Sequence, residues 1–343
     1  MTSLPRSSMG RKQRNKQRRI TALLVGVVLL SAAMSLCLGS VSVPLADVVS
    51  VLLGKQTGTV AARIVLYSRL PRTLGCLLTG AALAVAGAVI QSVLANPLAA
   101  PNVIGVNTGA GLAVTALSAL VPGAAALAPV AAFVGALAGV LVVLLIGERT
   151  GASRLTLVLA GIAVSAVFSG AVDLIVTLEP DALSAYADFR IGGFSSVTMG
   201  KVGPAAGVIA AGLAGVLLLT PQMDLLALGA DTAQSLGLRV RPARVLLLTG
   251  AAALSGAAVS IAGLLGFVGL IVPHGARKAA GGESLPLVTL SALGGAAFVT
   301  LCDLLARTLF APYELPVGVV LSFLGGPFFL WLILRQRGGG ARA

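Results

Sequence analysis

The sequence predicts an all-α protein that crosses a membrane about ten times. Hydrophobic residues make up 57% of its 343 residues and charged residues only 10%, and the mean hydropathy is +1.02. Soluble domains carry about 25% charged residues. The apolar residues form runs of roughly 20, the length at which a helix crosses a hydrocarbon layer ~30 Å thick. Because the alternating pattern of a membrane β-barrel is absent, helices are the architecture that satisfies the backbone in lipid.

The first apolar run, near 20–39, follows a basic tail formed by residues 1–19. Seven of the 24 Lys and Arg residues lie in this tail: Arg6, Arg11, Lys12, Arg14, Lys16, Arg18 and Arg19. The positive-inside rule holds such a cluster in the cytoplasm, next to anionic lipid headgroups. Nucleic acid is not favoured as a partner, because no aromatic residues are interleaved with the cluster. A cleaved signal peptide is the alternative, but the apolar run is too long and the segment before Cys37 lacks a cleavage site.

Ten crossings follow from the hydropathy pattern. They lie near 20–39, 73–94, 101–121, 126–147, 155–178, 203–221, 243–261, 263–275, 285–302 and 316–334. With the amino terminus inside, the cytoplasmic segments are 1–19, 148–154, 222–244, 276–284 and 335–343. These carry seventeen basic and four acidic residues, and the rest of the chain carries seven of each. The asymmetry supports this topology in a cell membrane, with 1–19 and 336–343 as cytoplasmic tails of a domain at 20–335.

The second crossing contains small residues at helical spacing. Gly80, Ala81, Ala84, Gly87 and Ala88 recur along it, and small residues let neighbouring helices approach closely in lipid. We therefore expect this helix to be buried among others. Its Gly80–Leu83 segment resembles Gly250–Leu254 of the seventh crossing, which runs in the opposite direction. Inverted repeats of this kind occur in transporters, although a chance match between Ala- and Gly-rich segments explains the similarity equally well.

The residues that usually form metal or catalytic sites are sparse. The three cysteines, Cys37, Cys76 and Cys302, lie in apolar runs without metal or disulfide spacing. His274 is the only histidine and has no second histidine to complete a zinc site. We therefore expect no catalytic residue, no metal site and no cofactor bound by this chain.

Three arginines are predicted at the outer side of the membrane. Arg69 and Arg72 flank Pro71 before the second crossing, and Arg307 lies near the end of the ninth. Arginines at this depth can extend to lipid headgroups. Alternatively, their guanidinium groups can form bidentate pairs with carboxylates of an acidic partner protein.

The cytoplasmic segment 222–244 is the only inner loop long enough to fold. Its leucines form an amphipathic pattern that Gly229 and Gly237 interrupt, which predicts two short helices joined by turns. Such helices could pack simply at the membrane interface, or they could form a surface on which another protein acts.

The fifth crossing carries polar residues on one face. Ser165, Ser169 and Asp173 follow one another at four-residue spacing, so they share one side of a helix. A carboxylate at the centre of a membrane helix costs about 2.5–3.5 kcal/mol on insertion scales and needs a water-filled path or a partner. We expect this face to line a pathway, with a structural hydrogen bond as the alternative.

Six segments together resemble the FecCD family of permeases. RLPR, GAALAVAGAVIQ, NPLAAPNVIG, LALGADTAQSLG, GFVGLIVPHGAR and PYELPVGVVLSFLGGPFFLWLI occur in the family's order over residues 60–335. The family contains the membrane subunits of bacterial ATP-driven importers for iron-siderophores, haem and cobalamin. The resemblance implies a ten-helix subunit with a cobalamin-permease-like fold that dimerises around a central pathway in the cytoplasmic membrane.

The resemblance also implies roles for individual residues. Arg69, Arg72 and Arg307 resemble the external arginines that meet acidic residues of a substrate-binding protein. The segment that would contact cytoplasmic ATP-binding subunits includes Leu228, Gly229, Ala230, Ala233, Leu236 and Gly237. Ala152 and Ser153 match the inner gate, and the Ser165, Ser169, Asp173 face would line the path. One departure is the segment Phe189–Ser195, where the family usually shows a tryptophan and a Gly-Ser pair.

The chain lacks its own energy source. No GxxxxGK[ST] phosphate loop is present, so ATP would be hydrolysed by a partner subunit. An ion-coupled carrier would need several intramembrane acids, but Asp173 and the boundary residue Asp303 are nearly alone, and a membrane enzyme would need clustered catalytic groups. We expect an importer for an iron(III)-siderophore, with haem or cobalamin as the alternative. The second permease subunit could be another copy or a paralogue.

Overall fold

The computed structural model describes residues 6–339 apart from residue 40 and the segments 56–57 and 151–153, and these residues form helices joined by loops, with no strand among them. Its helices are α1 (Arg6–Cys37), α2 (Leu45–Leu52), α3 (Val60–Ile64), the π-helical turn η1 (Val65–Arg69), α4 (Leu70–Val93), the 3-10 turn η2 (Pro101–Ile104), α5 (Val106–Leu120), the 3-10 turn η3 (Ala125–Leu127), α6 (Ala128–Arg149), α7 (Arg154–Leu178), α8 (Ala182–Ile191), α9 (Met199–Leu218), α10 (Thr220–Ala227), α11 (Ala230–Ser235), α12 (Val240–Ala262), α13 (Val268–Ala280), α14 (Ser284–Thr308) and α15 (Val317–Gly339). The predicted all-α class is confirmed.

Eight segments of the described chain are long and apolar enough to cross a membrane. They contain α1, α4, α6, α7, α9, α12, α14 and α15. The shorter helices α5 and α13 occupy the predicted third and eighth crossings, so the expectation of about ten is confirmed. The helix of the eighth crossing, α13, begins at Val268 rather than near Gly263, because Gly263 and Phe267 have positive φ angles of 68° and 66°. Its 13 residues span only about 20 Å, less than the hydrocarbon layer.

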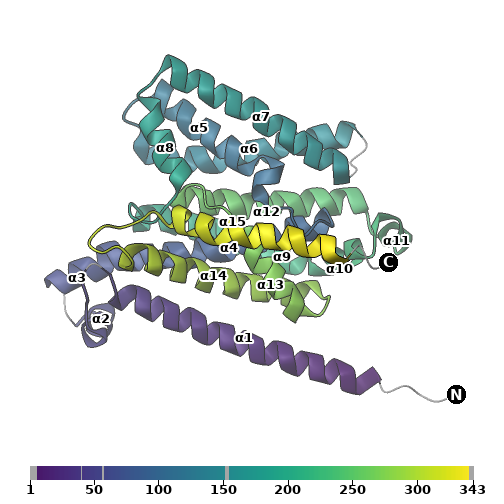
Figure 1. The fold of residues 1–343 in the computed structure, drawn as a ribbon, viewed down its shortest axis with the longest axis horizontal. Coiled ribbons are helices and arrows are strands. Elements are labelled where there is room, and N and C mark those ends of the chain that lie inside the picture. The colour runs from purple at the N-terminus through teal and green to yellow at the C-terminus, as the bar shows by residue number, and fades with distance from the viewer. Residues whose placement is uncertain (1–5, 40, 56–57, 151–153, 340–343) are drawn as a thin grey trace.

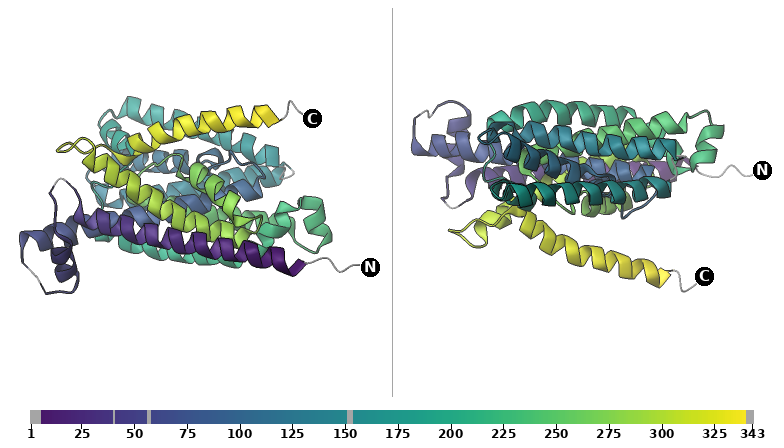
Figure 2. Two further views of the ribbon diagram at one scale, coloured as in Figure 1. Left: turned by 60° about the horizontal axis from the view of Figure 1, so that its bottom comes forward. Right: turned by 90° about the horizontal axis from the view of Figure 1, so that it is seen from above.

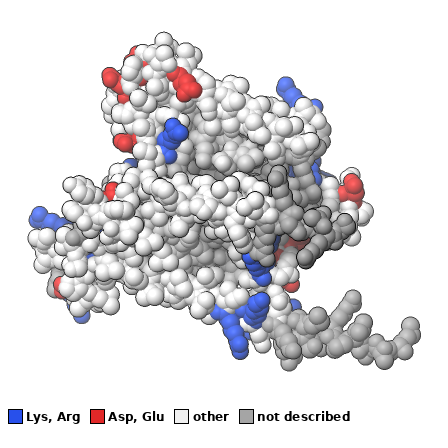
Figure 3. Space-filling model, viewed as in Figure 1, with Lys and Arg blue, Asp and Glu red and all other residues white. Residues whose placement is uncertain are grey.

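The two ends of the molecule carry different elements (Figure 1). The start of α1 and the end of α15 lie at the same end, together with α10 and α11, and Figure 2 shows this in two further views. We call this the inner end, in agreement with the even number of crossings. The small helices α2, α3 and α8 lie at the outer end. Charged side chains gather toward the two ends, with a largely uncharged band between them (Figure 3).

Helix α1 is longer than the predicted crossing. The run at 20–39 is continued toward the amino terminus as one helix from Arg6, so most of the basic tail belongs to this helix. Gln17 of α1 donates a hydrogen bond from Nε2 to the backbone oxygen of Ala280 at 2.8 Å. The inner half of α1 is thereby attached to the end of α13.

Helix α4 forms the centre of the bundle, as expected for the second crossing. It packs against α14, α12, α13 and α9, and most of its residues are buried. At two crossing points a glycine of α4 meets a glycine of a neighbour: a Cβ at Gly80 would overlap the carbonyl of Gly295, and a Cβ at Gly87 would overlap the carbonyl of Gly269. Backbones can approach this closely only where side chains are missing.

A second group of helices contains α5, α6, α7 and α8, shown at the top of Figure 1. Gly105 and Gly109 of the third crossing pack against Gly139 and Gly135 of α6 in the same close manner. Helix α12 joins the two groups because it packs against both α6 and α4. Helix α15 packs against α13 and α14 and lies apart from the rest of the bundle at its C-terminal end (Figure 2).

Candidate functional site

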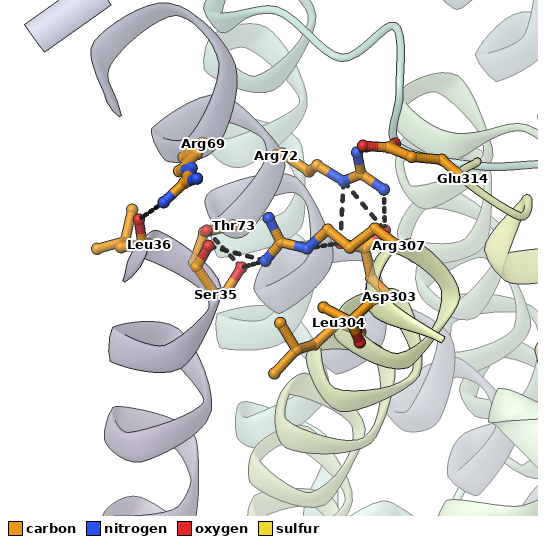
Figure 4. Close-up of polar contacts among 10 residues, drawn as sticks. Ser35, Leu36, Arg69, Arg72, Thr73, Asp303, Leu304, Arg307 and Glu314 are labelled. Atoms are coloured by element: carbon orange, nitrogen blue, oxygen red, sulfur yellow. Dashed lines mark hydrogen bonds and ion pairs between the residues drawn. The ribbon is translucent and has the colours of Figure 1, made fainter. Parts of the chain in front are cut away.

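The outer end of the bundle contains a buried ionic cluster (Figure 4). Arg72 of α4 binds Asp303 of α14 through two nitrogens, with Nε 2.9 Å from Oδ2 and Nη2 2.9 Å from Oδ1. Its Nη1 also lies 2.6 Å from Oε2 of Glu314, in the loop before α15. The fork of a guanidinium matches a carboxylate in this way. Arg72 thereby joins three segments that are distant in the sequence.

Arg307 extends the same cluster to α1. Its Nη2 donates to the backbone oxygen of Ser35 at 2.7 Å and to Ser35 Oγ at 2.8 Å. Ser35 Oγ also lies 2.7 Å from Thr73 Oγ1 of α4. The Nε atom of Arg307 is 3.6 Å from Asp303 Oδ2, an ion pair without a hydrogen bond. Asp303 therefore balances two arginines, and losing one partner of a buried pair costs about 3–5 kcal/mol.

Arg69 binds the carboxyl end of α1. Its Nη1 donates to the carbonyl oxygens of Leu36 and Cys37, at 2.7 Å and 2.6 Å, and its Nη2 to that of Val41. The last carbonyls of a helix have no partners inside the helix and carry a partial negative charge. The Arg69 guanidinium supplies hydrogen-bond donors and a positive charge to these carbonyls, and it fixes the end of α1 against η1, directly before α4.

The docking role predicted for Arg69, Arg72 and Arg307 stays a prediction, and the structure adds that their guanidinium groups have partners inside this chain. Arg69, Arg72 and Arg307 are only 5%, 8% and 3% exposed, and all three donate to groups of their own chain. Their partners, which are the end of α1, Glu314 and Asp303, lie far away in the sequence and could not be predicted from it. The ionic cluster formed by Arg69, Arg72, Arg307, Asp303 and Glu314 therefore fastens α1, α4 and α14 together.

The polar face predicted for the fifth crossing lies on α7. Ser165 is half-buried, and its Oγ accepts a hydrogen bond from Thr108 Oγ1 of α5 at 3.2 Å. Ser169 and Asp173 are exposed, and their side chains form no hydrogen bond or ion pair with any other described residue. The structure thus divides the face: Ser165 packs inward against α5, whereas Ser169 and Asp173 point away from the chain.

The inner segment folds as two short helices, α10 and α11, which confirms the prediction. Gly229 and Gly237 separate and end them with φ angles of 102° and 89°, a region that residues with a side chain rarely adopt. Ala233 is fully buried, whereas Leu228 and Leu236 are 60% and 59% exposed. The last residues of the predicted segment 222–244 belong to α12, which begins at Val240.

Helix α10 is attached to the bundle by its other side. Met223 and Leu226 are buried, and α10 packs against α4 and α14. Asp224 Oδ1 accepts a hydrogen bond from the backbone N–H of Ser284 at 2.7 Å. This caps the first turn of α14 from a different helix. Asp224 has no sequence signal for this role, since its partner lies 60 residues away.

The last predicted site, the inner gate at Ala152 and Ser153, lies outside the described residues. His274, the only histidine in the sequence, lies on α13 with its ring 5.7 Å from that of Phe328 on α15 in an edge-to-face contact. Lys278 Nζ lies 5.8 Å from the ring centre of Trp331, one turn further along the same two helices. These contacts attach α15 to α13 near the inner end.

Comparisons with known proteins agree with this architecture. The family model of the FecCD transport family matches residues 23–335. The chain is 39% identical to the hemin transport system permease protein of Yersinia pestis over 78% of this chain and 82% of that protein. It is 37% identical to the Fe(3+) dicitrate transport system permease protein of Escherichia coli, over 88% and 92% of the two chains.

A solved structure shows the same fold. A metal-chelate type ABC transporter in an inward-facing conformation superposes with a TM-score of 0.80 at 28% identity, covering 93% of this chain and 99% of that one. Sequence, fold and membrane topology therefore agree, and the chain belongs to the FecCD transport family as a multi-pass inner-membrane permease subunit of a metal-chelate type ABC importer.

Proposed function

We propose that this permease imports an iron(III)-siderophore, with ATP hydrolysed by a separate subunit. Its relatives support an iron chelate, since hemin and ferric dicitrate transporters are 39% and 37% identical to it. Haem is the second candidate because of the hemin relative, and cobalamin follows from the resemblance to the family. No residue described above selects among these cargoes.

The single observation that supports a translocation pathway along this chain is the exposed polar face of α7. Asp173 lies about five residues, or about 8 Å, from the outer end of the helix, and its carboxylate has no partner within the described residues. A lipid-facing carboxylate is costly, so such groups face water or a partner in membrane proteins. We infer that a second permease subunit covers this face of α7 and that Ser169 and Asp173 border a water-filled path between the two.

The inner segment supports coupling to an ATPase. Leu228 and Leu236 expose their apolar side chains at the inner end, between the candidate membrane spans Met199–Leu218 and Val240–Ala262. Apolar side chains in that position favour contact with another protein. The coupling residues are Leu228, Gly229, Ala230, Ala233, Leu236 and Gly237. In this role Ala233 supports the surface from below, and the two glycines set its shape.

A substrate-binding protein would dock at the outer end. To the docking role predicted for Arg69, Arg72 and Arg307, we propose to add the exposed cations Lys55, which follows α2, and Arg63, in α3, because their charges are open to acidic residues of that protein. Arg190 at the end of α8 is a third exposed cation at this end. Docking outside and closure of the ATPases inside would then reorient the path, as in alternating access.

Reconstituted vesicles test the proposal. The permease is co-expressed with its ATP-binding subunit, and uptake is measured with a loaded binding protein and radioactive ferric siderophores, haem or cobalamin. We expect uptake of a ferric siderophore that requires ATP. Uptake of haem or cobalamin alone would contradict the cargo, and uptake driven by an ion gradient without ATP would contradict the mechanism.

A further inference from the structure

An apolar groove opens on the side of the bundle between α6 and α9. Both helices pack against α12, whose residues Ala257 and Ser260 form the floor of a cavity of about 540 Å³. Its walls are apolar and come from two helices: Val130 and Phe133 of α6, and Pro204, Ala205 and Val208 of α9. Such a groove in a membrane protein is filled by lipid or by another apolar segment.

The groove lies in the outer half of the membrane. Its wall residues belong to the first turns of α6 and α9, which start at the outer end, and its floor belongs to the last two turns of α12, which ends there. From Lys201 to Val208 the helix rises about 10 Å. The groove therefore runs from the outer interface toward the centre of the bilayer, along the direction of an acyl chain.

The outer end of the groove is polar and positively charged. Lys201 and Thr198 lie there, and Lys201 Nζ donates to the backbone oxygen of Ser196 at 3.1 Å. Within the described part of the chain, no carboxylate forms an ion pair with Lys201. Two of the three donors of its ammonium group are thus available. Lys201 also lies in the first turn of α9, where the helix dipole favours an anion.

A second cavity adjoins this end. It has a volume of about 520 Å³, and Pro129, Lys201 and Ser260 line both cavities. Its polar lining includes Arg72, Asp188, Glu314, Ser195 and Ser196. An apolar cavity thus adjoins a more polar one at a lysine. This sequence of environments matches an amphiphile with one chain and a charged head.

We propose that the groove binds a phospholipid of the outer leaflet, with an acyl chain between α6 and α9 and its phosphate at Lys201. The charge favours this occupant over an apolar helix of a second copy, which would leave the ammonium group without an anion. The proposal does not depend on the cargo or on ATP coupling. It predicts a lipid that stays with the protein during purification, held by apolar contact and by one ion pair.

Native mass spectrometry tests the site. The protein is purified in mild detergent, depleted of lipid and titrated with phosphatidylglycerol, and bound lipid is counted. Lys201→Glu should lower lipid occupancy at least fivefold, since one basic residue near the headgroups contributes about 1 kcal/mol. Val130→Trp should lower it as well, because Val130 is 60% exposed on the groove wall and a larger side chain there can fill the groove without entering the core.

Matched controls separate the site from general effects. Lys55→Glu reverses an exposed charge at the outer end, and Leu145→Trp enlarges a 59% exposed residue of α6 outside the groove. Both should bind lipid as the unmodified chain does. If Val130→Trp elutes as an aggregate, lipid binding by Lys201→Gln tests the site, since this variant removes the charge with little change in side-chain size. Unchanged lipid binding in Lys201→Glu and Lys201→Gln would overturn the proposal. A changed oligomeric state in Val130→Trp, with lipid binding intact, would instead indicate an interface between copies.

Discussion

Asp224 of α10 accepts a hydrogen bond at 2.7 Å from the backbone N–H of Ser284, the first residue of α14. Helix α14 then runs through the bundle to the outer end, where it carries Asp303 and Arg307. The inner segment is therefore attached to the same helix that holds the ionic cluster. A movement of α10 and α11 would reach the outer end through α14.

Replacing Asp224 should loosen this attachment. Asp224→Ala removes the acceptor, and loss of such a cap costs about 0.5–2 kcal/mol. We expect a small fall in thermal stability and a lower ratio of cargo transported to ATP hydrolysed in the reconstituted importer. Asp224→Asn keeps an acceptor oxygen and should behave nearly as the unmodified protein. A coupling ratio unchanged in Asp224→Ala would contradict this role.

Reversing the charges of Arg69 and Arg307 should damage the fold rather than docking alone. In the double variant Arg69→Glu, Arg307→Glu, the end of α1 loses its cation and Asp303 faces a second acid. The loss should be several kcal/mol, seen as a lower melting temperature in detergent and faster proteolysis of the segment after α1. The control is Arg63→Glu, an exposed arginine near the same end. Equal melting temperatures of the two variants would show that the ionic cluster does not fasten the helices.

Replacement by alanine should have opposite effects on stability at two helical glycines, Gly80 of α4 and Gly207 of α9. Gly80→Ala places a Cβ against the carbonyl of Gly295 and forces α4 and α14 apart, whereas Gly207 of α9 has open space around it. Gly207→Ala should be neutral or stabilising by up to about 1 kcal/mol, because alanine favours a helix. Gly80→Ala should lower the melting temperature clearly. Equal effects would contradict the close contact of α4 and α14.

Asp173 should affect transport without affecting folding. Its carboxylate forms no hydrogen bond or ion pair with another described residue, so Asp173→Leu leaves no partner unsatisfied. We expect uptake to fall at least tenfold while yield and melting temperature stay the same. Leu174→Ala, at the neighbouring exposed position of α7, serves as the control. Full uptake by Asp173→Leu would remove this face from the pathway.

The crossings and the topology could be predicted because membrane insertion is a local property. Runs of about twenty apolar residues and the bias of basic residues identify each helix without its neighbours. The two helices of the inner segment were likewise predicted from Gly229 and Gly237, because the effect of a glycine on the backbone is local. The eighth crossing was placed too early because hydropathy does not register the turn between Gly263 and Phe267.

The site could be predicted only in part, because its contacts join distant segments. Arg72 and Asp303 are 231 residues apart, and Arg307 and Ser35 are 272 apart. The spacing of Arg69 and Arg72 indicates the outer interface, but it says nothing about which groups lie opposite. Ser165 shows the same limit, since its partner Thr108 belongs to another helix. Periodicity predicts which residues share a face, and only packing shows what that face contacts.

The central claim is that this chain is a passive pathway driven by a separate ATPase, and reconstitution of the purified chain tests it most directly. In vesicles, the permease alone should neither hydrolyse ATP nor accumulate a ferric siderophore. Adding the ATP-binding subunit and a loaded binding protein should produce accumulation that stops when ATP is removed. Sustained accumulation by the permease alone would contradict the account.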